Sequence, residues 1–268
     1  MTRIDLNADM GEGMGDDAAM LSIVTSANVA CGMHAGDPDT MARTMRAAVE
    51  RGVGIGAHPG FADRENFGRR RTVLPPDSLA TLIRYQVGAA QAIVQAAGGR
   101  LRHLKLHGAM SNMAATDRAM ALTCYRAALE VQGDLILMVQ AATEMERAAV
   151  ELGAPYAAEI FADRAYEEDG TLLDRSKPGA VLHDAAEAAA RIGAMIGEGA
   201  IITASGRRIP SRIDTVCVHG DTPGAVAMAR ATCGRRLKAR GGGGGAVRGA
   251  LSADGHLLAG SRTRSSFL

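Results

Sequence analysis

The chain has 268 residues, 47% of them hydrophobic, so it can bury a full core and favours one large domain over two. Its 30 basic and 29 acidic residues leave a formal net charge of +1, which gives no electrostatic reason to expect nucleic acid or a membrane surface as partner. Aromatic residues make up 3% of the chain and tryptophan is absent, which argues against a platform for stacking nucleic-acid bases.

We expect a cytoplasmic protein. The first residues, MTRIDLNADMG, lack the basic segment and apolar core that mark a secretory signal. No apolar run reaches the roughly 18 residues that suggest a membrane-spanning helix. The four cysteines, Cys31, Cys124, Cys217 and Cys233, lie far apart without C-x-x-C spacing, so they are most simply reduced thiols.

Short β-rich runs alternate along the chain with longer stretches of helical spacing. The runs predict strands at residues 3–7, 26–30, 53–57, 101–106, 135–139, 158–161 and 214–218, with a shorter one at 200–203. The longer stretches predict helices at residues 38–51, 77–97, 115–131, 143–152, 184–197 and 222–240. Asp37 followed by Pro38 is typical of a helix start. This alternation predicts parallel strands joined by crossover helices.

The number of units favours a closed (β/α) barrel, irregular, seven-stranded and TIM-like, over an open α/β sheet. A dinucleotide-binding fold is disfavoured because GEGMG, at residues 11–15, lacks the last glycine of the fingerprint, and the next strand has no acidic residue at its end. The glycine run at residues 241–245 is no phosphate-binding loop, because no Lys-Ser/Thr pair follows it.

We predict one barrel domain over residues 1–240 and a flexible, glycine-rich C-terminal tail over residues 241–268. The tail loses apolar periodicity, and its five consecutive glycines are costly to order. Two inner segments, residues 58–77 and 162–180, are too long and too charged for plain strand–helix connections. We therefore expect both to fold over the barrel rim as lids.

Six polar residues come where predicted strands end: Asp9, His34, His58, His107, Asp163 and His219. A single histidine is usually structural, and each of these taken alone allows that interpretation. The carboxyl ends of parallel barrel strands meet at one rim, where active sites are built. The repetition therefore favours one shared site over coincidence.

The strand HLKLH alternates polar and apolar residues, so His103, Lys105 and His107 share one face. Leu104 and Leu106 suit the outer face that helices cover, which directs the polar face into the barrel. We expect Lys105 and His107 to reach the site and His103 to lie deeper. Because a rim tolerates truncation better than a core, we expect a Lys105→Ala variant to keep its fold.

In LNADMGEG, Asn7 and Asp9 share a face and Glu12 follows in the turn. These groups suit either a cap for the next helix or a site that binds a cation or polarises water, and we favour the site. Asp9, Glu12 and His58 are the candidate metal ligands. No two histidines stand at the H-x-x-x-H spacing typical of zinc enzymes, so the presence of a metal stays open.

Six segments together resemble the LamB/YcsF family, the A subunits of 5-oxoprolinases. They are IDLNADMGEG, SANVACGMHAGDP, GIGAHPGFADRENFGRR, HLKLHGAMSNM, EIFADRAYEEDGTLLDRSKPGA and TVCVHGD, in order from residue 3 to about residue 233. The resemblance implies a barrel of the glycoside hydrolase/deacetylase type. It also implies ATP-dependent hydrolysis of 5-oxo-L-proline (pyroglutamate) to L-glutamate with two further subunits, B and C. ATP is then a co-substrate accompanied by Mg²⁺, and no organic cofactor is expected.

The resemblance further implies a set of site residues. Catalytic roles fall to Asp9, Glu12, His58, Lys105, His107 and Asp163. Substrate-binding roles fall to His34, Asp37, Arg64, Asn66, Asn112, Arg164, His219 and Asp221. Within these sets we expect an arginine to hold the substrate carboxylate, Lys105 to stabilise an oxyanion or phosphate, and His107 or His58 to act with Asp163 in acid–base catalysis.

Two alternatives remain. A stand-alone metal-dependent amidohydrolase or deacetylase would act without ATP, and a non-catalytic subunit would bind the lactam for its partners. The chain also departs from the family pattern K-P-H-G-x-L-Y-N, because Leu106 replaces the proline and Ser111 replaces the tyrosine.

Overall fold

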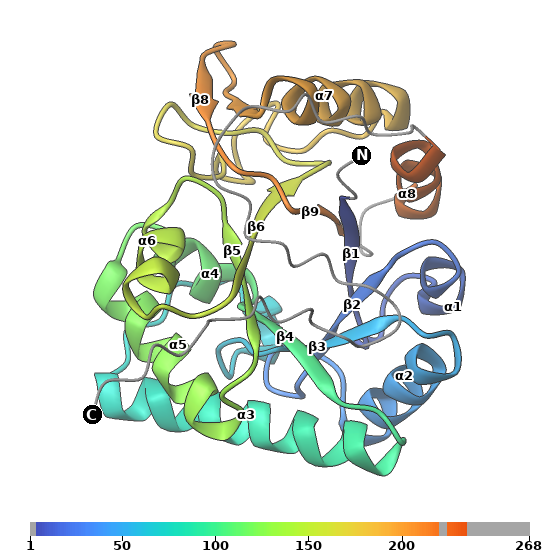
Figure 1. The fold of residues 1–268 in the computed structure, drawn as a ribbon, viewed down its shortest axis with the longest axis vertical. Helices are drawn as coiled ribbons and strands as arrows, with labels where there is room; N and C mark the ends of the chain where they lie inside the picture. Colours follow the sequence, from blue (N-terminus) through green and yellow to red (C-terminus); the bar gives the residue numbers. More distant parts are fainter. Residues whose placement is uncertain (1–3, 220–223, 235–268) are drawn as a thin grey trace, which may run out of the picture.

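A computed structural model describes residues 4–219 and 224–234 of the chain. Seven parallel strands form a closed barrel (Figure 1). In order around the barrel they are β1 (Asp5–Met10), β2 (Ser26–Ala30), β3 (Gly54–His58), β4 (Leu101–Lys105), β5 (Ile136–Gln140), β6 (Tyr156–Phe161) and β9 (Thr215–Val218). Strand β9 pairs with β6 on one side and β1 on the other, which closes the ring. The predicted seven-stranded (β/α) barrel is confirmed.

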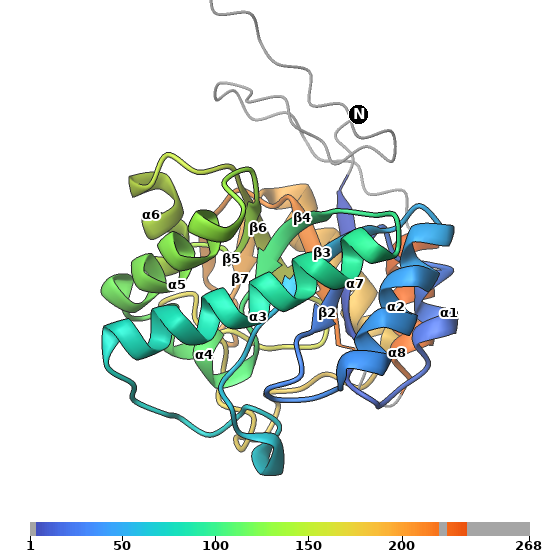
Figure 2. The same cartoon turned by 90° about the horizontal axis from the view of Figure 1, so that it is seen from below.

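Helices surround the strands, and Figure 2 shows α3 running along the outside with α2 and α5 on either side of it. The helices are α1 (Asp17–Leu21), α2 (Pro38–Glu50), α3 (Pro76–Ala96), α4 (Gly108–Ala114), α5 (Arg118–Val131), α6 (Glu144–Glu151), α7 (Ala185–Glu198) and α8 (Ala225–Gly234), with a short 3₁₀ turn, η1 (Arg64–Asn66). Within the described residues, every helix is too short or too polar to cross a membrane.

The weaker strand predicted at residues 200–203 lies outside the barrel. It forms β7 (Ala200–Ile202), which pairs antiparallel with β8 (Arg208–Pro210). Because β6 pairs directly with β9, the closed ring has no free edge for an eighth strand. The sequence also failed to predict α1 and α4. The tail at residues 241–268 and the end of the last predicted helix lie outside the described residues.

The interior of the barrel is polar. Asn7, Asn28, His103 and Thr215 are fully buried, and Glu159 is 2% exposed. Asn28 donates to the side-chain oxygens of Asn7 and Asp9, both at 2.8 Å, and its own oxygen lies 2.7 Å from His103 Nε2. Asn7 donates to Glu159 and Thr215. Such a hydrogen-bonded interior differs from the branched apolar layers typical of TIM barrels, and it forms a rigid polar base beneath the rim.

A glycine makes room for this interior. A Cβ atom placed on Gly56 would lie 2.1 Å from two ring atoms of His103, far inside van der Waals contact. Gly56 and His103 are also direct partners across the β3–β4 pair. A large ring can therefore occupy the interior only because the neighbouring strand has no side chain at this point.

Candidate functional site

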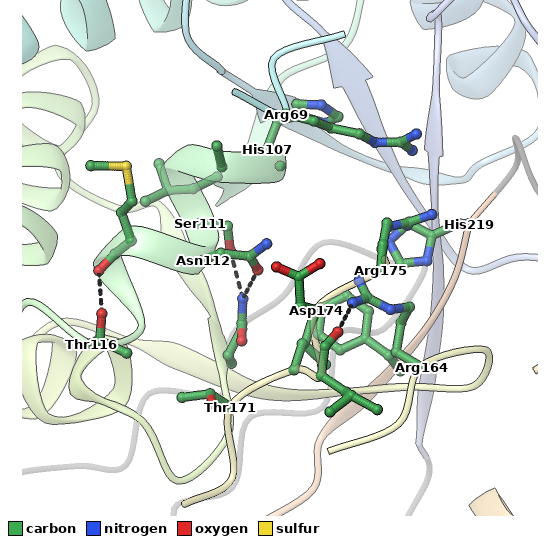
Figure 3. Close-up of a pocket in the computed structure, with 18 of the residues that line it drawn as sticks. Arg69, His107, Ser111, Asn112, Thr116, Arg164, Thr171, Asp174, Arg175 and His219 are labelled. Atoms are coloured by element: carbon green, nitrogen blue, oxygen red, sulfur yellow. Dashed lines mark hydrogen bonds between the residues drawn. The ribbon is translucent and has the colours of Figure 1, made fainter. Parts of the chain in front are cut away.

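A cavity of about 390 Å³ opens at the carboxyl ends of the strands. Its lining includes Asp9, Lys105, His107, Arg164, Arg175 and His219, and Figure 3 shows most of these side chains converging on it. The lining residues come from β1, β4, β5 and β6, from α4 and the residues flanking it, from the residue after β9, and from both predicted lids, at 58–77 and 162–180. The rim expected from the strand-end pattern is therefore hollowed into a pocket.

Lys105 is the centre of a buried ion network. Its Nζ atom lies 2.9 Å from Asp9 Oδ1, 3.1 Å from Glu159 Oε1 and 2.9 Å from Cys217 Sγ. An ammonium group has three hydrogens to donate, and Lys105 donates to Asp9 Oδ1, Cys217 Sγ and, at 3.4 Å, Asn7 Oδ1, which uses them all. Burial alone would lower the pKa of Lys105, but Asp9, Cys217 and Glu159 raise it well above its usual value. Lys105 is therefore a fixed positive charge.

The two carboxylates of this network differ. Burial alone would raise the pKa of Asp9, but His58 and Lys105 outweigh it and hold the pKa well below its usual value. Glu159 lies deeper, and burial raises its pKa despite the nearby ammonium. Asp9 is the main counterion of Lys105. Because β1 runs to Met10, Asp9 projects from the strand itself rather than from the turn after it.

Asp163 and His219 form a second pair. Both Asp163 oxygens lie within 2.9 Å of His219 Nδ1, and the other ring nitrogen, Nε2, lies 3.9 Å from Asp9 Oδ2. Burial alone would raise the pKa of Asp163, but His219 lowers it to about 2. Asp163 contacts His219, whereas the sequence led us to expect it to act with His107 or His58. The strand-end pattern placed all three histidines at the rim but could not pair them.

Glu12, His34, His58 and His107 form a compact group that we call the histidine cluster. His58 Nε2 lies 3.1 Å from His107 Nδ1, and Glu12 Oε1 lies 3.5 Å from His34 Nε2 and 3.6 Å from His107 Nδ1. The rings of His34 and His107 stack at 3.7 Å between centroids. Burial lowers the pKa of His34 well below its usual value and that of His107 to about 3. Both rings are therefore neutral at physiological pH.

The first part of the predicted lid at 58–77 covers the histidine cluster. Phe67 O lies 2.8 Å from His107 Nε2. A Cβ on Gly60 would lie 2.7 Å from His34 Nδ1, and one on Gly68 would lie 2.7 Å from His34 Cβ. Gly68 also has φ of 63°, in the left-handed region that favours glycine. These glycines allow the segment to press directly onto the two stacked rings.

Several predicted substrate-binding residues have other contacts. Asp37 is exposed and caps α2, accepting from the backbone and hydroxyl of Thr40. Arg64 is exposed and donates to the carbonyl oxygens of Gly32 and Gly36.

Asn66 is also exposed and donates to Asp63 at 2.7 Å. Of the predicted substrate-binding residues, Asn112, Arg164 and His219 line the cavity. Arg164 is 3% exposed, donates to Leu173 O at 2.6 Å, and has its pKa lowered to about 10 by burial. Asp221 lies outside the described residues.

The strand-end pattern missed several polar residues of the site. Asn28, Glu159 and Cys217 lie within strands and reach the network from the barrel interior. Glu159 is the one charged residue of its strand, and that isolated charge is the signal that could have identified it. Arg175 lines the cavity from the 162–180 loop, where the sequence carries no periodic signal.

Comparisons with known proteins agree with this architecture. A match to the LamB/YcsF family covers residues 4–245. The chain is 57% identical to the 5-oxoprolinase A subunit of Ruegeria pomeroyi over 235 residues, covering 86% of this chain and 93% of that protein. It is 50% identical to the 5-oxoprolinase A subunit of Rhodopseudomonas palustris over 234 residues, covering 85% and 92%.

A solved structure extends the similarity to three dimensions. The lactam utilization protein from Thermus thermophilus superposes with a TM-score of 0.80 at 39% identity, covering 87% of this chain and 95% of that one. Sequence and fold agree over nearly the whole described chain. The protein therefore belongs to the LamB/YcsF family.

Proposed function

We propose that the chain is the A subunit of an ATP-dependent 5-oxoprolinase, which hydrolyses 5-oxo-L-proline to L-glutamate. The observation that carries the proposal is the near full-length similarity to proteins named as A subunits of 5-oxoprolinase. The cavity volume, about 390 Å³, is in the range of roughly 300–1,000 Å³ usual for small-molecule sites. The arginines in its wall suit a substrate with a carboxylate.

The chemistry explains why ATP is needed. The lactam is a resonance-stabilised amide, so its carbonyl carbon is a poor electrophile. Phosphoryl transfer from ATP to the lactam oxygen activates that carbon. Water then adds to it, the C–N bond breaks with a proton delivered to nitrogen, and hydrolysis of the acyl phosphate leaves glutamate, ADP and phosphate. The protein must hold the carboxylate, position water and supply that proton.

We assign the substrate carboxylate to Arg164. It is buried in the cavity wall, whereas Arg64 is exposed and bonded to backbone carbonyls. Guanidinium can bind a carboxylate through two parallel hydrogen bonds. Arg175 lines the same cavity and adds positive charge.

We assign the acid–base role to His219. Asp163 accepts from Nδ1 and so orients the ring, leaving Nε2 to exchange a proton with water or with the ring nitrogen of the substrate. Lys105 acts through its charge and through its hold on Asp9, because its three donors are already used. It is a positioning residue here rather than a direct oxyanion ligand.

We assign Mg²⁺ to the ATP phosphates rather than to a site in this chain. Mg²⁺ prefers oxygen ligands, whereas the histidine cluster supplies three nitrogens and one carboxylate. Asp9 Oδ1 is already bonded to Lys105 and Asn28. The partners in this proposal are subunits B and C, and the location is the cytoplasm, where ATP is available and thiols stay reduced.

The test is glutamate release from 5-oxo-L-proline and ATP with this chain alone, with subunits B and C alone, and with all three. We expect turnover only from the complete set. His219→Asn should abolish it, whereas Arg164→Lys should mainly raise KM. Release by this chain alone without ATP would overturn the proposal in favour of a stand-alone metal-dependent amidohydrolase, the alternative that the histidine cluster favours. Turnover by B and C alone would reduce this chain to a lactam-binding subunit.

A further inference from the structure

The proposed function leaves the histidine cluster without a role. Glu12 is 9% exposed, and His34, His58 and His107 are between 1% and 5% exposed. The four side chains come from separate turns that follow β1 and β2, from the end of β3, and from the residue before α4. Four donor atoms, one from each residue, lie within 4.8 Å of one another. Assembling such a group from four places in the chain is costly unless something binds there.

The hydrogen bonds of two rings fix where their protons are. His58 Nδ1 lies 2.8 Å from Lys105 O, and His107 Nε2 lies 2.8 Å from Phe67 O. A carbonyl oxygen can only accept, so each of these nitrogens carries the hydrogen. The opposite atoms, His58 Nε2 and His107 Nδ1, are the nitrogens left to present lone pairs, and they face each other at 3.1 Å. Two lone pairs at that distance repel unless a cation lies between them.

This arrangement is the one that metal-binding histidines use. A ligating histidine usually donates its other N–H to a carbonyl or carboxylate, which fixes the tautomer and aims the free nitrogen at the ion. His58 and His107 both do so through backbone carbonyls. The carboxylate of Glu12 lies beside them, 3.6 Å from His107 Nδ1.

His34 supplies an independent observation. Its ring is buried, and neither ring nitrogen has a hydrogen-bond partner among the described residues. Its Nε2 atom is aimed at Glu12 Oε1 across 3.5 Å, too long for a good hydrogen bond. A buried polar group without a partner is costly, and a bound ion would satisfy Nε2.

The distances suit a tetrahedral ion. With metal–ligand bonds of about 2.0–2.1 Å, tetrahedral ligand atoms lie about 3.3–3.4 Å from one another. The contacts of 3.1, 3.5 and 3.6 Å within the cluster surround that value. The remaining pairs, all within 4.8 Å, need to close slightly. Three imidazoles and one carboxylate suit Zn²⁺ and its neighbours in the first transition row, and do not suit Mg²⁺ or Ca²⁺.

The neighbouring group of Asp9, Cys217 and His219 does not compete for the ion. Its donor atoms are also close together, but the ammonium of Lys105 already bonds Asp9 and Cys217 at 2.9 Å. That position therefore already holds a positive charge. In the histidine cluster the contacts recorded are among its own side chains, with Glu12 Oε1 3.5 Å from His34 Nε2 and 3.6 Å from His107 Nδ1.

We propose that Glu12, His34, His58 and His107 bind one divalent transition-metal ion of the Zn²⁺ type. Four protein ligands complete a tetrahedral shell and leave no position for water, so the ion is structural. It joins the turns after β1 and β2 to β3 and α4 beneath the cavity, and it supports the wall formed by His107. Hydrolysis of the lactam does not require this ion to activate water.

The test uses the purified full-length chain, stripped with a chelator and dialysed. We expect elemental analysis after Zn²⁺ loading to give one ion per chain, and the melting temperature to rise with Zn²⁺ concentration but not with Mg²⁺. Co²⁺, loaded in place of Zn²⁺, should give the intense visible absorption of a tetrahedral site. Absence of a stoichiometric ion in the wild-type chain would overturn the proposal and would assign an extra proton to the His58–His107 contact.

Variants locate the ion. Glu12→Gln and His34→Asn should each weaken Zn²⁺ affinity at least about 100-fold and remove the Zn²⁺-dependent rise in melting temperature. His183→Asn, at an exposed histidine outside the cluster, should change neither. Circular dichroism of the metal-free proteins checks that the variants fold. If a variant does not fold, the Zn²⁺ titration of the wild-type chain still tests the proposal. Equal binding by all three variants would overturn the assignment. Because no readout here uses turnover, failure of the proposed 5-oxoprolinase activity is detected separately.

Discussion

Replacing Lys105 by methionine tests the buried ion network. The change keeps the side-chain length but removes an ammonium bonded to Asp9 at 2.9 Å and Glu159 at 3.1 Å. Removing one partner of a buried ion pair costs about 3–5 kcal/mol, because the other charge stays buried. For a domain of this size, 1 kcal/mol shifts the melting temperature by about 2–4 °C, so we expect a fall of roughly 6–20 °C. The sequence alone led us to expect that the fold tolerates loss of Lys105. The structure instead predicts a large loss of stability.

The assay is urea denaturation together with thermal unfolding, followed by circular dichroism. Lys177→Met is the matched control, because Lys177 pairs with Glu167 at 2.8 Å while 56% exposed, and solvent screens such a pair so that its loss should change stability little. Adding Glu159→Gln to Lys105→Met should recover part of the loss.

The same variant gives a pH signature. Burial already raises the folded-state pKa of Glu159, and without the ammonium it rises further above that of the unfolded chain, while the pKa of Asp9 loses one of the charges that lower it. The variant's free energy of unfolding therefore falls furthest below that of the wild type at pH values above the raised pKa. The difference shrinks as the pH falls through that pKa, provided the wild type remains folded. A Lys105→Met variant no less stable than Lys177→Met at neutral pH would refute the reasoning.

Three further outcomes are expected. Gly56→Ala should lower the free energy of unfolding by more than about 3 kcal/mol in urea titrations, because its Cβ would lie 2.1 Å from His103 ring atoms; a neutral variant would contradict the tight packing. Asp163→Asn should remove about 2 kcal/mol of the free energy of unfolding above pH ~4, since His219 holds the pKa of Asp163 at about 2, and the gap should close as the pH falls toward 2; a pH-independent gap would count against the ion pair. In the native protein only Cys233, the exposed cysteine, should react rapidly with DTNB, and all four should react after unfolding; rapid labelling of a second thiol would indicate a looser core.

The sequence was sufficient for the fold class and for the end of the barrel at which the polar side chains gather. Strand–helix alternation determines that parallel strands must be covered by helices, and a parallel barrel brings strand ends to one rim. Asp9, His58, His107 and His219 meet there as expected. The period of two in HLKLH was likewise enough to direct Lys105 and His103 into the barrel.

Which side chains touch was decided only by the tertiary structure. A strand-end pattern places a residue along the barrel axis but not around its circumference, so it could not pair Asp163 with His219 instead of His107. It could not show that Asp37 is a helix cap, because aspartate before proline suits both a cap and a site.

Local sequence also could not show that Glu159 would form an ion pair with Lys105, because the two residues are 54 positions apart in the chain. Strand register and barrel closure set these contacts, and both depend on packing between segments far apart in the chain. Propensity and periodicity act over a few residues, whereas pairing across a closed barrel is a property of the whole ring.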